Sequence, residues 1–174
     1  KLTGLILDLR SNPGGLVTAA VDLADEFLAE VVIVSIKGRN ALTNTTYYGK
    51  PGQSFEGVKV LVLIDAGSAS ASEILAGALQ DHQRATIMGS RSFGKGSVQN
   101  VFYLDNGDAF KITTARYYTP NNRSIQAQGI VPDVLLEGNG KAGYTEKDLP
   151  KHINGGTVDN NQAESGIVLT GDVY

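Results

Sequence analysis

Two segments of this sequence carry side chains that could act together on a carbonyl group. The segment from Gly67 to Glu73 contains three candidate nucleophiles: Ser68, Ser70 and Ser72. A serine hydroxyl is a weak nucleophile by itself and needs a base close by. Lys95, which stands between two glycines, is the candidate base. Together the two segments indicate nucleophilic catalysis, but their spacing does not choose among the three serines.

Each segment also has a purely structural interpretation. Ser70 and Glu73 form the pattern Ser-x-x-Glu, a capping box at the start of a helix. Lys95 is, on that interpretation, a surface lysine on a glycine turn. Catalysis requires a neutral lysine, and burial in an apolar pocket, with Phe93 as one wall, favours the neutral form. The capping and catalytic interpretations of Ser70 are compatible.

A phosphate-binding loop is a third interpretation, and it fails on two points. Residues 89–95 match the pattern Gly-x-x-x-x-Gly-Lys after an apolar run. The next position, where Ser or Thr binds magnesium, is Gly96. Residues 97–104 then have the pattern of a strand, whereas a phosphate loop leads into a helix. We therefore expect no nucleotide at this loop.

The elements around these segments predict an α/β fold, with a mostly parallel, helix-covered sheet and an added β-hairpin. Apolar residues at helical spacing predict helices over residues 16–29 and 70–82. Apolar runs predict strands over residues 2–9, 31–36, 58–64, 85–88 and 131–136. The turn Asp105-Asn106-Gly107 predicts a hairpin of residues 97–104 and 108–117, and a short Thr/Tyr hairpin is expected around residues 45–48. Residues 154–174 read as a loose polar tail.

This topology brings three loops to one edge of the sheet. Right-handed crossovers place the strand-to-helix loops at the carboxyl ends of parallel strands, where ligands usually bind. The loops are residues 10–15, 65–70 and 89–96. A helix carries the chain ~20 Å away and a strand brings it back, so Ser70 and Lys95 can meet. Backbone N–H groups of the first helical turn, with those of the turn ending at Gly14 and Gly15, could then stabilise an oxyanion.

Composition argues against several other kinds of site. The chain has 174 residues, with 15 Lys plus Arg against 18 Asp plus Glu, and this acidic balance argues against a nucleic-acid partner. The absence of cysteine excludes a Cys nucleophile and a thiolate zinc site, and two histidines make a histidine metal site unlikely to form. No apolar run reaches the ~18 residues of a membrane span. The chain opens inside an apolar run, which we interpret as a piece of a longer protein.

Three blocks of the sequence, in this order, closely resemble the C-terminal processing peptidases, also called tail-specific proteases. The blocks are Leu5-Ile-Leu-Asp-Leu-Arg-Ser-Asn-Pro-Gly-Gly15, Ser68-Ala-Ser-Ala-Ser-Glu-Ile74 and Phe93-Gly-Lys-Gly-Ser-Val-Gln99. The likeness extends over residues 2–153. It implies a serine endopeptidase with a Ser–Lys dyad and no cofactor, on a fold similar to that of the Clp protease and crotonase group.

The resemblance also implies a role for individual residues. The central serine, Ser70, matches the family nucleophile, and Lys95 matches the general base. Gln99 matches a glutamine that orients the lysine in some members. Backbone N–H groups match the oxyanion hole, and they belong to Ala71 and to Gly14 or Gly15. Glu73 falls on an acidic position of the family, which helix capping explains almost as well.

Partners and location follow from the same resemblance. It implies polypeptide substrates with unstructured C-termini, an upstream PDZ domain, and action in the periplasm, cell envelope or thylakoid lumen. We expect residues 1–153 to be the catalytic core and residues 154–174 a tail; the resemblance also allows a homo-oligomer. Two alternatives stay open: a catalytically silent relative that binds peptides or serves as a scaffold, and a crotonase-like acyl-CoA enzyme.

Overall fold

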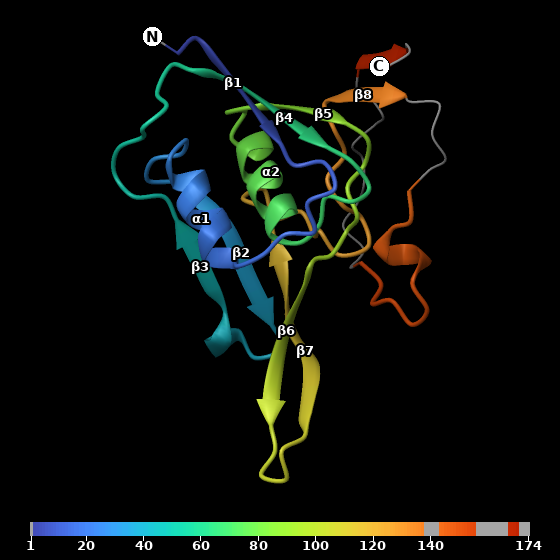
Figure 1. The fold of residues 1–174 in the computed structure, drawn as a ribbon. Coiled ribbons are helices and arrows are strands. Elements are labelled where there is room, and N and C mark those ends of the chain that lie inside the picture. Colours follow the sequence, from blue (N-terminus) through green and yellow to red (C-terminus); the bar gives the residue numbers. More distant parts are fainter. Residues whose placement is uncertain (1, 138–142, 156–166, 171–174) are drawn as a thin grey trace.

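The computed structural model describes residues 2–137, 143–155 and 167–170, and places them in two sheets with two helices (Figure 1). Sheet A is parallel, with its strands in the spatial order β1 (Gly4–Asp8), β4 (Lys59–Ile64), β5 (Thr86–Gly89), β8 (Val134–Glu137) and β9 (Ile167–Thr170). Sheet B is antiparallel, in the order β3 (Thr45–Tyr48), β2 (Val32–Gly38), β7 (Ala109–Tyr118) and β6 (Ser97–Tyr103). The helices are α1 (Val17–Asp25) and α2 (Ala71–Asp81), with short 3₁₀ turns η1 (Ala41–Thr43) and η2 (Glu146–Asp148).

The predicted α/β fold is confirmed, and the core lies where both helices pack between the sheets. Helix α2 contacts β5 of sheet A and β2 of sheet B, and α1 packs on α2 and β2. Every residue of α2 from Ala71 to Leu79 is buried. The largest fully buried apolar side chains, each less than 2% exposed, include Phe27, Ile33, Ile64, Ile74, Leu79 and Ile87. Burying each of them stabilises the fold by about 1.5–3 kcal/mol.

Within the described residues, helices lie on one face of sheet A, so the expectation of a sheet covered by helices is met on that face. Inward side chains of β4 such as Val62 and Ile64 are fully buried, whereas Leu61 and Leu63, which alternate with them, are half-buried. On β1, at the edge of the sheet, Ile6 is 62% exposed. Successive side chains of a strand point to opposite faces of the sheet, which separates the two faces. The apolar runs in the sequence did not indicate that the two faces differ in burial.

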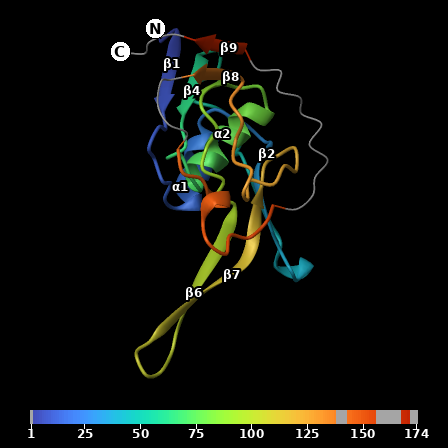
Figure 2. The same cartoon turned by 90° about the vertical axis from the view of Figure 1, so that its right-hand side faces the viewer.

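The hairpin predicted at residues 105–107 is confirmed, and it projects away from the rest of the fold (Figures 1 and 2). Gly107 has φ +88°, and its N–H donates to Leu104 O at 3.0 Å. The strand predicted over residues 31–36 forms, but as β2 of sheet B and not in the parallel sheet. Its outward residues Ser35 and Lys37 alternate with the inward Ile36, a pattern suited to a half-solvated antiparallel strand.

Two elements differ in extent from the prediction. Helix α1 ends at Asp25, before the predicted residue 29, although the N–H groups of Phe27 and Leu28 still donate to Ala24 O at 3.0 Å. Strand β9 lies within the predicted tail and extends sheet A beside β8, because its short apolar run pairs in parallel with Val134–Glu137. None of the helices in the described ranges is long and apolar enough to span a bilayer.

Candidate active site

The three predicted loops meet at the carboxyl ends of β1, β4 and β5. Asp65 joins the first loop to the second, because its Oδ1 accepts from the N–H groups of Ser11 and Gly67, each at 2.8 Å. The Ala69 N–H donates to Asn12 O at 3.0 Å. The second loop is joined to the third by the Phe93 N–H, which donates to Ser68 O at 2.9 Å. The loops are therefore held to one another by hydrogen bonds from backbone N–H groups to backbone carbonyls and to the Asp65 carboxylate.

The structure separates the three serines that the sequence left equivalent. Ser68 is fully buried, and its hydroxyl donates to Leu9 O at 2.7 Å. Ser72 is 5% exposed, and its hydroxyl donates to Asn12 O at 3.1 Å. Ser70 lies between them and keeps part of its surface accessible. Two of the three hydroxyls thus hold the loop together, and Ser70 is the one that an incoming group can reach.

Ser70 occupies a strained position where the chain turns from the loop into α2. Its φ is 55° and its ψ is −116°, a backbone conformation that residues other than glycine rarely adopt. Such strain costs about 1–3 kcal/mol and persists only where the surroundings enforce it. The predicted capping box is present, and the Ser70 N–H donates to Glu73 Oε2 at 2.8 Å. The helix start therefore fixes the sharp turn that carries the Ser70 side chain.

Glu73 connects the serine loop to the lysine loop. Its Oε2 accepts from the N–H groups of both Ser70 and Lys95, at 2.8 and 2.9 Å. Its Oε1 accepts from the Gly94 N–H at 2.7 Å and from the Ser92 hydroxyl at 2.5 Å. Because one carboxylate oxygen holds the backbone nitrogens of Ser70 and Lys95, those nitrogens lie close together. The predicted meeting of the two loops is therefore observed.

Burial of the Glu73 carboxyl also changes its acidity. The side chain is fully buried, and desolvation raises its pKa from 4.5 to about 6. The hydrogen bonds from Ser92, Gly94, Ser70 and Lys95 act in the opposite direction, since they stabilise the carboxylate. The sequence predicted a helix cap at Glu73 and, by resemblance, an acidic position of the family; its hydrogen bonds to Ser92, Gly94 and Lys95 of the other loop gave no signal in the spacing.

The Lys95 loop is fixed on its other side as well. The Gly96 N–H donates to Gln126 Oε1 at 3.0 Å, and the Ala127 N–H donates to Gly94 O at 2.8 Å. The N–H groups of Gly94 and Lys95 are occupied by the Glu73 carboxylate and are not presented to a phosphate, and β6 follows in place of a helix. The side chains of Lys95 and Phe93 are half-exposed, so the apolar enclosure expected for the lysine is incomplete in this chain.

The glycines expected in the oxyanion hole lie beside Ser70. A Cβ on Gly14, whose φ is +97°, would lie 2.6 Å from Ala69 O and 2.8 Å from Ala71 N, so only glycine fits there. The Gly14 N–H donates to Asn12 Oδ1 at 3.0 Å and is already occupied. Among the described residues, the N–H groups of Gly15 and Ala71 have no acceptor. Those two donors are available to a ligand.

Gln99 is the predicted site residue for which the described residues show no hydrogen bond to Ser70 or Lys95. It is exposed on β6, and its Nε2 donates to Thr113 Oγ1 at 3.5 Å, the outer limit of a hydrogen bond. Elsewhere at the site, Asp8 and Arg10 form an exposed ion pair of 2.7 Å, and this hydrogen bonding lowers the pKa of Asp8 to about 2. No three His, Asp or Glu side chains in the described ranges lie where they could hold a metal ion.

A small apolar cavity adjoins the available donors. Its volume is about 170 Å³, and it lies between the start of α1 and the start of α2. Gly14, Gly15 and Ala71 form its rim, and its walls are mostly apolar: Leu9, Leu16, Ala19, Ala20, Leu23 and Leu75. A cavity of this size and character suits a small apolar side chain of a bound peptide.

These features define an α/β chain with a serine at a strained turn, at the carboxyl edge of a parallel sheet. The sequence matches the model of peptidase family S41 over residues 1–136, and the chain belongs to that family. The resemblance to C-terminal processing peptidases is confirmed by the relatives that follow.

Three relatives show how far the likeness extends. The chain is 52% identical over 137 residues to a carboxy-terminal-processing protease of Bartonella bacilliformis, covering 79% of this chain and 32% of that protein. It is 44% identical over 130 residues to carboxyl-terminal-processing peptidase 3, chloroplastic, of Arabidopsis thaliana, covering 74% and 25%. The solved photosystem II D1 C-terminal processing protease superposes with a TM-score of 0.72 at 39% identity, covering 78% of this chain and 35% of that one. The chain thus spans about a third of the length of its relatives.

Proposed function

We propose that this chain is the catalytic core of a serine endopeptidase that cleaves polypeptides near their C-termini, with Ser70 as nucleophile and Lys95 as general base. One observation carries the proposal: the accessible serine at a strained turn and the lysine loop are both bound to the buried Glu73 carboxylate. The membership in family S41 and the names of the relatives support it.

The chemistry follows from the positions of these groups. Neutral Lys95 takes the Ser70 hydroxyl proton as Oγ bonds to the peptide carbonyl carbon, and the charge that develops on the carbonyl oxygen is stabilised by the N–H groups of Ala71 and Gly15. The Lys95 ammonium then returns the proton to the leaving amine, which leaves an ester on Ser70. Water next gives a proton to Lys95 as its oxygen bonds to the ester carbonyl carbon. The bond from that carbon to Ser70 Oγ then breaks, and the Lys95 ammonium returns the proton to Oγ, which restores the Ser70 hydroxyl and the neutral lysine. Gly14, the alternative donor, is less suited because its N–H is bound to Asn12.

The apolar cavity beside the donors would receive the side chain that precedes the cleaved bond. Its volume of about 170 Å³ and its mostly apolar lining suit a small apolar residue. Gln99 would orient Lys95 only after a change of rotamer, since its amide now contacts Thr113. We assign it the weakest role of the predicted residues.

The partners and location expected from the relatives remain part of this proposal. The partners are polypeptide substrates with unstructured C-termini, an upstream PDZ domain and a second copy of the chain. The location is outside the cytoplasm or in a plastid lumen. The relatives from Arabidopsis thaliana and Tetradesmus obliquus are chloroplastic enzymes, which supports the plastid part of this proposal.

Turnover of an unstructured polypeptide with an apolar C-terminus tests the proposal, measured on the full-length protein. We expect Ser70→Ala and Lys95→Ala each to lower kcat by about 10³-fold or more. Ser72→Ala is the matched control, because it removes a neighbouring hydroxyl that only holds the loop, and it should keep most of the activity. A fluorophosphonate reagent should label wild type at Ser70.

Three outcomes would contradict the assignment. Full turnover by Ser70→Ala would show that another group is the nucleophile. Binding of the polypeptide without turnover or labelling in wild type would favour the silent, peptide-binding relative. Tight binding of an acyl-CoA thioester would favour the crotonase-like alternative.

A further inference from the structure

Two buried polar side chains, Glu73 and Gln126, hold the backbone on the two sides of Lys95. Both side chains are fully buried. The Lys95 N–H donates to Glu73 Oε2 at 2.9 Å, and the Gly96 N–H donates to Gln126 Oε1 at 3.0 Å. The Gly96 N–H also donates to Gly94 O at 3.2 Å, which closes a three-residue turn around Lys95. The peptide groups before and after the Lys95 Cα are therefore both anchored.

These two anchors determine where the Lys95 side chain points. A peptide group is planar, so fixing the groups on both sides of a Cα fixes the two backbone dihedrals of that residue, and with them the direction of its Cα–Cβ bond. The neighbours of Lys95 are Gly94 and Gly96, and glycine has more backbone freedom than any other residue. Without an acceptor for the Gly96 N–H, the second peptide group is free to turn, and the amine at the end of the four-carbon lysine stem moves with it.

The Gln126 amide fits this place in one orientation. Its Oε1 faces the Gly96 N–H, while its Nε2 donates to Glu146 Oε1 at 3.1 Å and to Ile153 O at 3.0 Å. An amide turned by half a rotation would place its NH₂ group against the Gly96 N–H and its oxygen against two acceptors. Both amide hydrogens and the amide oxygen thus have partners, as the burial of the side chain requires.

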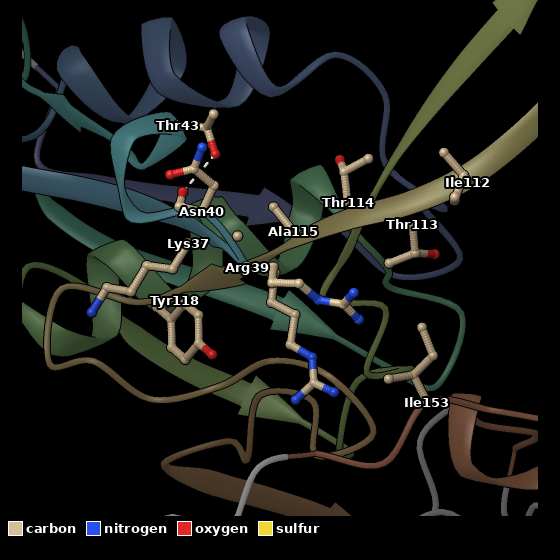
Figure 3. A pocket seen from close by; sticks show the side chains of 12 residues that line it. Lys37, Arg39, Asn40, Thr43, Ile112, Thr113, Thr114, Ala115, Tyr118 and Ile153 are labelled. Atoms are coloured by element: carbon tan, nitrogen blue, oxygen red, sulfur yellow. Dashed lines mark hydrogen bonds between the residues drawn. The ribbon is translucent and has the colours of Figure 1, made fainter.

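Gln126 connects the lysine loop to the segment of residues 143–155. The same segment contacts the loop directly, because the Glu146 N–H donates to Phe93 O at 2.9 Å. Ile153 also lines the sheet B cavity, a hollow of about 690 Å³ on β2 and β7 (Figure 3). Three cations line this cavity as well: Lys37, Arg39 and Arg116. The backbone at Ile153 is thus held between the wall of the cavity and the Gln126 amide.

We propose that Gln126 is a positioning residue for the proposed general base. Its amide fixes the peptide group that follows Lys95, as the Glu73 carboxylate fixes the one that precedes it. Through its Nε2, it also joins residues 143–155 to the lysine loop. The inference rests on the proposed function, since that function makes Lys95 the base for Ser70.

The groups proposed to bind substrate lie apart from this contact. The available N–H groups belong to Gly15 and Ala71, and the apolar cavity beside them lies between the starts of α1 and α2. Neither Gln126 nor any of residues 92–96 lines that cavity. Loss of the Gln126 amide should therefore lower kcat and leave KM nearly unchanged.

Steady-state turnover of an unstructured polypeptide by the full-length protein tests this role. Gln126→Met nearly keeps the length of the side chain and removes its amide. Because a displacement of about 1 Å can cost about 100-fold in rate, we expect this variant to lower kcat by about 10- to 100-fold, with KM changed less than about twofold. Amide hydrogen exchange, measured by mass spectrometry, should be faster than in wild type for the peptide that contains Gly96.

Gln80→Met is the matched control, because it removes a similarly bonded amide from the far end of α2. Gln80 Nε2 donates to Val131 O and to Asp133 Oδ1, each at 2.8 Å, and its Oε1 accepts from Arg123 at 2.9 Å. The control therefore loses as many hydrogen bonds as Gln126→Met without touching the lysine loop. Its kcat should stay within about twofold of wild type.

An exchange of two side chains provides a rescue that a general loss of stability would not show. Gln126→Glu keeps an oxygen for the Gly96 N–H but places the other oxygen against the Glu146 carboxylate, so it should also lower kcat. In Gln126→Glu/Glu146→Gln, the amide lies on the other side of the contact and donates to the new carboxylate. We expect the double variant to recover at least about threefold in kcat over Gln126→Glu.

Three results would overturn the inference. They are a kcat of Gln126→Met within about twofold of wild type, an equal loss of kcat in Gln80→Met, and a double variant no faster than Gln126→Glu. Circular dichroism verifies that each variant is folded; if Gln126→Met does not fold, the comparison of Gln126→Glu with the double variant decides. Full activity of Gln126→Met beside an inactive Lys95→Ala would overturn this inference and leave the proposed function in place. Full turnover by Lys95→Ala would overturn both.

Discussion

Replacing Glu73 with Gln tests how the serine and lysine loops are held together. The carboxylate accepts four hydrogen bonds, two on each oxygen, from donors in both loops. A glutamine amide has one acceptor oxygen, and its NH₂ group only donates. If the NH₂ group takes the place of Oε1, it faces the backbone N–H of Gly94. If it takes the place of Oε2, it faces the backbone N–H groups of Ser70 and Lys95. A backbone N–H cannot rotate away, so at least one such donor loses its acceptor.

The size of the effect follows from two opposing contributions. Each hydrogen bond to the charged group contributes about 1.5–3 kcal/mol, and one or two are lost while the others weaken. Removing the charge also removes its desolvation cost, which is the larger influence on the Glu73 pKa and offsets part of this loss. We expect Glu73→Gln to lower the free energy of unfolding by about 2–4 kcal/mol. We also expect it to lower kcat, because the two loops lose their shared anchor.

Guanidinium unfolding followed by circular dichroism measures this change, since the chain has no tryptophan. Glu56→Gln is the matched control: Glu56 is exposed, and the substitution should alter stability by less than about 0.5 kcal/mol. If Glu73→Gln behaved like the control, with full activity, the Glu73 carboxylate would not be what joins the loops.

The remaining predictions concern pH, the glycine turn, an ion pair and a buried aromatic ring. Because the Glu73 pKa is raised from 4.5 to about 6, the native state binds more protons than the unfolded state between these pH values. The free energy of unfolding of wild type should therefore rise by about 1–2 kcal/mol relative to that of Glu73→Gln as the pH falls from 7 to 4.5. No change in that difference would refute the buried carboxylate. Gly14→Ala should abolish turnover, because its Cβ would lie 2.6 Å from a backbone oxygen of the loop. A Cβ on Gly15 meets open space, so Gly15→Ala should leave the melting temperature nearly unchanged. Equal effects of the two substitutions would contradict this geometry. Asp81→Asn removes the ion-pair partner of the partly buried Arg123 and should lower the free energy of unfolding by about 1–3 kcal/mol. A variant that melts at the wild-type temperature would refute this expectation. Phe27→Ala removes a buried ring stacked 5.0 Å from Phe55 and should cost about 3–5 kcal/mol; a loss below 1 kcal/mol would show that the site repacks.

Periodicity and turn chemistry predicted the elements that position the site. The two helices, the parallel strands that precede the three loops, and the hairpin at residues 105–107 all form within a few residues of expectation. These features depend on local patterns, such as apolar spacing along a helix and the backbone freedom of Gly107. The prediction that Ser70 and Lys95 meet required only that parallel strands share a carboxyl edge.

Other features depend on contacts between distant segments, for which the sequence carries no local signal. The choice of Ser70 over Ser68 and Ser72 rests, in the structure, on which hydroxyls are buried against the backbone carbonyls of Leu9 and Asn12. The placement of β2 in sheet B is likewise a matter of which strand it pairs with, and an apolar run pairs equally well in either sheet.

By itself, the sequence determined the fold class, the three loops and the residue types available for chemistry, because each of these follows from neighbours along the chain. The tertiary structure alone decided which groups share a partner. The Glu73 carboxylate binds two loops because burial leaves it no water, so the N–H groups around it become its hydrogen-bond donors. The cations of the sheet B cavity come together because strand pairing places Lys37 beside Arg116, which lies 79 positions later in the sequence.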